Sequence, residues 1–132
     1  MRRGLQIVLV VGGLVAITTG LVQLVGGVDV FPGSPSADNA ADNEARFLNA
    51  FWIAFGVALL WVTPRVERET TLVRFLAAAL FLAGLSRLVS IIDVGEPADL
   101  QYVLMAIELT LAPLVVVWQA LLRKREQPTA AA

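Results

Sequence analysis

Residues 4–28 read GLQIVLVVGGLVAITTGLVQLVGGV and contain no charged side chain. A helix needs about 20 predominantly apolar residues to cross the hydrocarbon core of a bilayer. This stretch therefore predicts a membrane-spanning helix. Arg2 and Arg3 in front of it resemble the basic start of a secretory signal peptide. The apolar part of a signal peptide has only about 7–15 residues, however, so a retained helix is favoured.

Three further apolar stretches cover residues 47–64, 72–92 and 100–122. The last two contain Arg87 and Glu108, which spanning helices tolerate at a cost. Short loops rich in Pro, Gly, Ser, Asp and Asn separate the stretches, so neighbouring helices should run antiparallel. The sequence predicts an all-α fold, a four-helix transmembrane bundle with helices at about 4–28, 44–63, 72–92 and 99–122.

The composition agrees with a membrane protein. Of the 132 residues 58% are hydrophobic and only 16% are charged, and the mean hydropathy is +0.76. Soluble domains are about half apolar and a quarter charged. At this length we expect a single four-helix membrane domain over residues 1–125 and a disordered tail over residues 126–132.

The chain has no cysteine and no histidine. Disulfides, thiolate nucleophiles, histidine metal ligands and a histidine general base are therefore excluded. We expect no metal, no cofactor and no catalytic residue, and the sequence leans away from an enzyme. The formal net charge of −1 argues against a nucleic-acid partner.

The basic residues gather on one side of the expected topology, which contains both termini and the 63–71 loop. The positive-inside rule places that side in the cytoplasm. Arginine outnumbers lysine, and alanine and valine abound, which indicates a bacterial source and a multi-pass protein of the bacterial inner membrane. Eight of the ten basic residues contribute: Arg2, Arg3, Arg65, Arg68, Arg74, Arg123, Lys124 and Arg125.

Small residues recur at a spacing of four on two of the expected helices. Such ladders let helix backbones approach closely in lipid. They indicate either packing inside the bundle or a surface for a partner subunit. The two ladders are Gly12, Ala16 and Gly20 on the first helix and Ala50, Ala54 and Ala58 on the second.

Arg87 and Glu108 are expected at similar depths on adjacent helices. Arg87 lies roughly 9 Å inside Asp93, and Glu108 roughly 13 Å beyond Asp99, at 1.5 Å per residue. Each charge near a helix centre costs about 2.5–3.5 kcal/mol on insertion scales. A pair that faces the bundle interior removes most of that cost, so we expect the two to interact.

Further polar residues are expected at the same end of the bundle. Together they form a candidate ligand-binding cluster that opens toward the outside. Three interpretations remain: a structural ion pair, a ligand or proton-handling site, and a docking surface for another membrane protein. The candidate cluster consists of Glu44, Arg46, Asn49, Arg87, Ser90 and Glu108.

Two segments carry a resemblance to a known family: NEARF at residues 43–47, and AGLSRLVSIID at 83–93 followed by Gly95 and Pro97. They resemble a family of small bacterial four-helix integral membrane proteins classified as a domain of unknown function. The resemblance implies a four-helix fold and a polar cluster, and no activity. The residues at the matching positions are Glu44, Arg46, Arg87, Ser90 and Glu108.

Three functions fit these observations. The first is a non-enzymatic protein that binds a small amphiphile or lipid, with Arg46 and Arg87 as anion contacts. The second is an accessory subunit of a larger membrane complex, packed through small-residue faces. The third is a membrane-embedded acid/base enzyme with Glu108 as proton carrier. The expected partners are membrane lipid, a membrane protein or a second copy of the chain.

Overall fold

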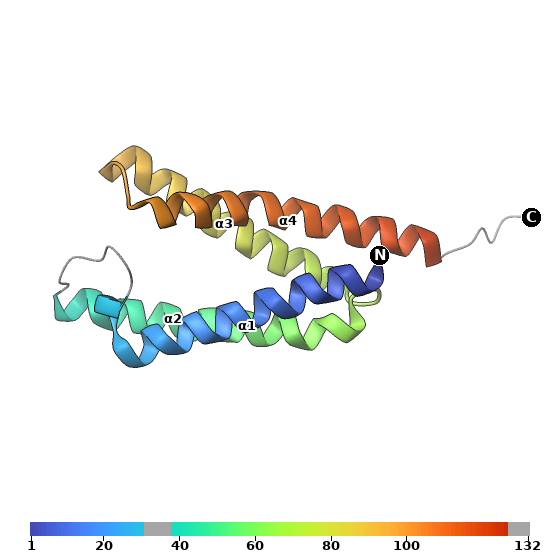
Figure 1. Ribbon diagram of the computed structural model, residues 1–132, viewed down its shortest axis with the longest axis horizontal. Helices are drawn as coiled ribbons and strands as arrows, with labels where there is room; N and C mark the ends of the chain where they lie inside the picture. Colours follow the sequence, from blue (N-terminus) through green and yellow to red (C-terminus); the bar gives the residue numbers. More distant parts are fainter. Residues whose placement is uncertain (31–37, 127–132) are drawn as a thin grey trace, which may run out of the picture. The chain divides into compact units, whose positions relative to one another are not determined.

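The computed structural model describes residues 1–30 and 38–126 (Figure 1). Every element in these ranges is helical, and four helices are long and apolar enough to cross a membrane. The predicted all-α class with four spanning helices is confirmed, and the chain is a multi-pass membrane protein. Apart from Glu126, the expected disordered tail lies outside the described residues.

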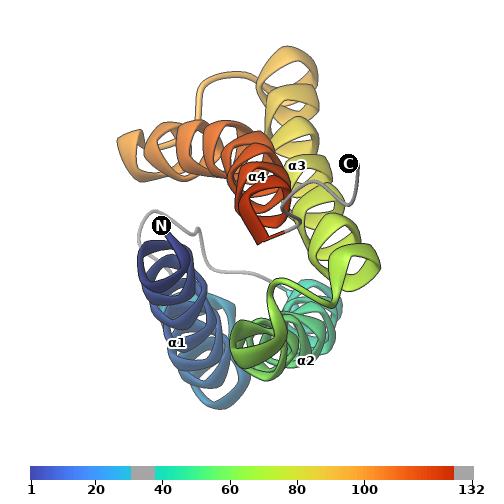
Figure 2. The ribbon, with the colours of Figure 1, turned by 90° about the vertical axis from the view of Figure 1, so that its right-hand side faces the viewer.

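The chain divides into two compact units. One is Ile7–Pro64, and the other joins Met1–Gln6 to Arg65–Ala132. Each unit contains a pair of long helices. Figure 2 shows α1 beside α2 in one pair and α3 beside α4 in the other.

The first unit contains most of α1 (Arg2–Gly26), the short 3-10 helix η1 (Val28–Val30) and α2 (Asn39–Val62). Gly27 ends α1 because its φ of +76° is a left-handed conformation that favours glycine. Asp38 caps α2: its carboxylate accepts a hydrogen bond from the Ala41 amide at 2.8 Å. The cap explains why α2 begins at Asn39 rather than near residue 44.

Glycines set the packing of α1 on α2. A Cβ added to Gly13 would lie 2.9 Å from the Gly56 carbonyl oxygen, and one added to Gly56 would lie 2.7 Å from the Gly13 carbonyl oxygen. A Cβ added to Gly20 would lie 2.7 Å from the Ile53 side chain and 3.2 Å from the Asn49 carbonyl oxygen. The two backbones therefore approach as closely as a small-residue interface permits.

The two expected ladders of small residues differ in their burial. Ala16 of the first ladder is buried at 1% exposure. Ala50 and Ala54 of the second are exposed. Successive helical residues are rotated by about 100°, so the face of α2 that meets α1 lies one residue away from the alanine ladder.

The second unit contains α3 (Thr70–Val94) and α4 (Asp99–Glu126), and the 3-10 helix η2 (Thr63–Arg65) leads into it. Gly95, at a φ of +112°, ends α3, and α4 continues without a break through Pro113. Gly84 brings α3 close to α4: an added Cβ would lie 2.8 Å from the Leu109 side chain.

Buried contacts hold the ends of this unit together. The side-chain amide of Gln119, which is 1% exposed, donates to the Val66 carbonyl at 2.6 Å. Gly4 packs against the Trp118 ring, where an added Cβ would lie 2.8 Å from Cζ2. These contacts bring the first residues of the chain and the turn before α3 to the last turns of α4.

Candidate functional site

Arg87 on α3 and Glu108 on α4 form an ion pair with two hydrogen bonds. Arg87 Nε donates to Glu108 Oε2 at 2.8 Å, and Nη2 donates to Oε1 at 3.1 Å. The Glu108 side chain is 7% exposed and that of Arg87 31%. Two-point arginine–carboxylate pairs are among the stronger hydrogen-bonded contacts because both partners are charged and their planar groups match.

The backbone around this pair permits the contact. Gly84 lies one turn before Arg87, and a Cβ there would lie 3.2 Å from the Cβ of Glu108. Without a side chain at Gly84, α4 approaches near enough for the two charged groups to meet. The similar depths expected from the sequence are thus followed by the predicted contact between the two charges.

The guanidinium of Arg87 keeps unused donors. An arginine carries five N–H groups, of which two bind Glu108 here. The Nη1 group has no acceptor among the described residues. Ser90, one turn further along α3, is exposed, and its hydroxyl makes no hydrogen bond within the described part of the chain. Arg87 and Ser90 can therefore contact a group that approaches from outside this unit.

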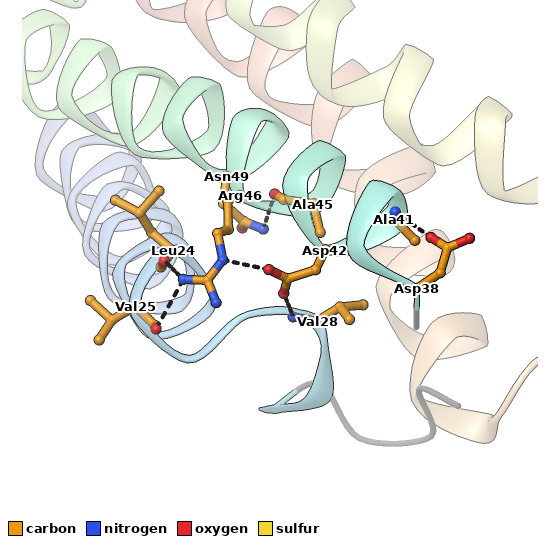
Figure 3. A network of polar contacts seen from close by, with 9 residues as sticks. All are labelled: Leu24, Val25, Val28, Asp38, Ala41, Asp42, Ala45, Arg46 and Asn49. Carbon is orange, nitrogen blue, oxygen red and sulfur yellow. Dashed lines mark hydrogen bonds and ion pairs between the residues drawn. The ribbon is translucent and has the colours of Figure 1, made fainter. Parts of the chain in front are cut away.

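Arg46 on α2 has a different environment (Figure 3). Its Nε donates to Asp42 Oδ2 at 2.7 Å, while Nη1 donates to the carbonyl oxygens of Leu24 at 2.7 Å and Val25 at 3.1 Å. The other oxygen of Asp42 accepts a hydrogen bond from the Val28 amide at 3.0 Å. Arg46 thus binds the carboxyl end of α1 and its own neighbour on α2.

This arrangement satisfies groups that α1 cannot satisfy itself. The last carbonyls of a helix have no partner within the helix, and a cation at that end also complements the helix dipole. Gly27 makes room for the contact, since an added Cβ would meet the Asp42 carboxylate and lie 2.7 Å from Arg46 Nη2. The network explains Arg46 as a C-terminal cap of α1.

Two more hydrogen bonds join α1 to α2 beyond this cap. Asn49, which is buried, donates across the interface to Gln23 Oε1 at 3.2 Å, and it also donates to the Ala45 carbonyl of its own helix at 2.8 Å. The Trp52 indole donates to the Thr19 hydroxyl at 3.0 Å. In lipid such bonds stabilise helix association modestly.

The six predicted site residues thus occupy different surroundings. Arg87 and Glu108 contact each other in one unit, with Ser90 exposed nearby on α3. Arg46 and Asn49 hold α1 and α2 together in the other unit. Glu44 is exposed, and its carboxylate has no hydrogen bond or ion pair with any described residue. Ligand binding by this set stays a prediction.

Sequence reasoning missed Asp42 as the partner of Arg46. The signal was present, because an Asp–Arg spacing of four places both side chains on one helix face. The described residues contain no group of three or more His, Cys, Asp and Glu side chains placed to hold a metal ion.

The family model described as Domain of unknown function (DUF4345) matches residues 4–119. The matched range contains all six predicted site residues. No curated protein and no solved structure matches the chain.

Proposed function

The chain belongs to the DUF4345 family of unknown function, and on this premise we propose that it binds the anionic headgroup of a membrane amphiphile at Arg87. The headgroup carries a phosphate or a carboxylate. Glu108 holds the guanidinium in place, and Ser90 adds a hydrogen bond. The protein acts as a binding protein of the bacterial inner membrane, with both termini in the cytoplasm.

The observation that supports this proposal is that Glu108 binds only part of the Arg87 guanidinium. Glu108 occupies one edge of it through Nε and Nη2, which leaves Nη1 for an anion. Arg87 is 31% exposed at its side chain, whereas Glu108 is 7% exposed. A ligand therefore reaches the arginine and not the carboxylate, which supports an anionic group over a cationic one.

The surroundings of Arg87 on α3 suit an amphiphile. Phe81, Leu82 and Leu85 are large apolar side chains with 38%, 63% and 36% exposure. They lie further from the Val94 end of α3 than Arg87, so an acyl chain that packs on them leaves its headgroup near Arg87 and Ser90. Arginine suits the role because its planar fork matches phosphate and carboxylate oxygens.

An acid/base enzyme receives less support. A proton carrier needs an oxygen that is accessible to the reacting group. Both carboxylate oxygens of Glu108 accept hydrogen bonds from Arg87, and the side chain is buried. Glu108 thus fits a positioning role better than a catalytic one.

Native mass spectrometry of the protein purified in mild detergent tests the proposal. We expect the wild type to retain an anionic amphiphile. The double variant Arg87→Met/Glu108→Leu removes both charges together, and we expect it to fold and to retain one amphiphile molecule fewer than the wild type. A double variant with unchanged occupancy would refute the site. If that variant does not fold, Arg87→Lys serves instead, since lysine keeps the positive charge but lacks the planar guanidinium that binds two oxygens at once.

Two serines of α3 give a matched control. Ser86 and Ser90 are both exposed and lie one turn apart. The Ser86 hydroxyl already donates to the Ala83 carbonyl at 2.7 Å, whereas Ser90 has no such bond within the described residues. Ser90→Ala should lower the occupancy, and Ser86→Ala should leave it unchanged. Equal effects of the two substitutions would remove Ser90 from the site.

A second function is favoured by the exposed ladder on α2. Ala50 and Ala54 do not meet α1 and remain available for close helix contact. This supports the alternative of an accessory subunit bound to another membrane protein or to a second copy. The same spectra distinguish the two functions, because a stoichiometric protein partner would appear in place of a lipid.

A further inference from the structure

One end of the second unit concentrates basic side chains. Three segments meet there: the first residues of the chain, the turn before α3 and the last turns of α4. The Gln119–Val66 hydrogen bond and the Gly4–Trp118 contact hold them together. The basic residues that these segments and the first turns of α3 carry are Arg2, Arg3, Arg65, Arg68, Arg74, Arg123, Lys124 and Arg125.

Few acidic groups balance this end. Arg2 pairs with Glu67 at 2.8 Å between Nε and Oε1. Arg68 and Arg74 are exposed, Arg123 is half-buried, and none of the three forms an ion pair within the described residues. The opposite end of the same unit, the turn between α3 and α4, is acidic and carries Asp93, Glu96 and Asp99.

The basic charges are positioned by buried contacts. Gln119 lies one turn before Arg123 on α4, and Val66 lies two residues before Arg68. Their 2.6 Å hydrogen bond therefore holds together the backbone segments that carry these two arginines. A preorganised set of charges binds an anion better than a flexible one, because less freedom is lost on binding.

We propose that this basic end is a binding surface for the phosphate headgroups of anionic phospholipids, with Arg68, Arg74 and Arg123 as the main contacts. The guanidinium fork matches phosphate oxygens. Positive charge next to the membrane surface is attracted to anionic lipid. The surface lies away from Arg87, and the inference does not rest on the proposed function.

Tryptophan fluorescence of the reconstituted full chain tests this surface. Trp118 lies five residues before Arg123 and reports on lipids bound there, once Trp52 and Trp61 are replaced by Phe. Quenching by brominated phosphatidylglycerol is compared with quenching by brominated phosphatidylcholine. The orientation of the protein in the vesicle does not matter, because both leaflets have the same composition.

We expect a preference for phosphatidylglycerol that Arg68→Gln/Arg74→Gln/Arg123→Gln lowers at least about two-fold. The corresponding triple lysine variant should keep most of it. Asp93→Asn/Glu96→Asn/Asp99→Asn changes the same number of charges at the other end and should leave the preference unchanged. An unchanged preference in the glutamine variant, or an equal loss in the acidic-end control, would overturn the proposal.

Salt gives a measurement that needs no charge substitution. At about 1 M salt the Debye length is about 3 Å, so exposed charges are largely screened. The preference of the Trp118-only protein should then disappear. A preference that persists at high salt would indicate another origin and would overturn the proposal, even if the glutamine variant does not fold.

Discussion

Arg87 and Glu108, 21 positions apart in the sequence, join α3 to α4 through two hydrogen bonds, Nε to Oε2 at 2.8 Å and Nη2 to Oε1 at 3.1 Å. Removal of one partner leaves the other charge uncompensated in a mostly apolar helix pair. Removal of both leaves no such charge. The pair should therefore show strong coupling in stability.

We predict that Arg87→Met and Glu108→Leu each lower the free energy of unfolding by about 3 kcal/mol. This is the lower part of the range for buried pairs, because Arg87 is 31% exposed at its side chain. The double variant should lose much less than the sum. Unfolding in mixed detergent micelles measures all three variants. Additive losses would contradict the coupling.

Gly84 should be intolerant of any larger side chain. An added Cβ would lie 2.8 Å from the Leu109 side chain, so Gly84→Val should lower the free energy of unfolding by about 1–3 kcal/mol through overpacking. Ala78→Val, at an exposed position of α3, is the control and should have little effect. Leu109→Ala should partly rescue Gly84→Val; no rescue would argue against this contact as the cause.

Long apolar stretches predicted the helices well, even where they contain Arg87 or Glu108, because a bilayer leaves few alternatives to a helix of about 20 predominantly apolar residues. The Arg87–Glu108 pair was also predictable, since the rise per residue gives the depth of each charge. Both inferences use properties of one helix at a time. They do not require knowledge of which helix faces meet.

The role of Arg46 was not predictable in this way. Its acceptors are the carbonyl oxygens of Leu24 and Val25. Every residue has such a backbone group, so the pattern of side chains does not identify these two as acceptors. The alanine ladder on α2 was also misleading as a guide to the α1–α2 contact. A spacing of four identifies a face, but packing against a particular neighbour decides whether that face is used, and here Gly56 and Asn49 meet α1 instead.

Arg46→Met should loosen the carboxyl end of α1. The substitution leaves the Leu24 and Val25 carbonyls and the Asp42 carboxylate without their hydrogen bonds to the guanidinium. We expect a loss of about 1–3 kcal/mol and faster hydrogen exchange of the Val28 amide. Glu44→Gln, two residues earlier and exposed, is the control. Unchanged exchange at Val28 would rule out the capping role.

Two adjacent glycines on α1 should respond differently to alanine. A Cβ at Gly13 would lie 2.9 Å from the Gly56 carbonyl oxygen, whereas one at Gly12 would make only an ordinary contact of 3.7 Å with Leu59. Gly13→Ala should therefore cost about 1–3 kcal/mol. Gly12→Ala should be neutral or stabilising, because alanine is the better helix former. Thermal unfolding in detergent measures both, and equal losses would contradict the close approach at Gly13.

The distribution of basic residues predicts the orientation of the chain in the membrane. Eight of the ten basic residues lie on the side that contains both termini, so the positive-inside rule places that side in the cytoplasm. The natural chain has no cysteine, and single cysteines therefore report their own positions. In intact bacterial cells an impermeant maleimide should label Glu96→Cys, in the turn between α3 and α4, and should label Arg125→Cys only after permeabilisation. Because both residues are exposed, a failure to label reflects the membrane barrier, and the reverse pattern would invert the orientation and place the basic end outside.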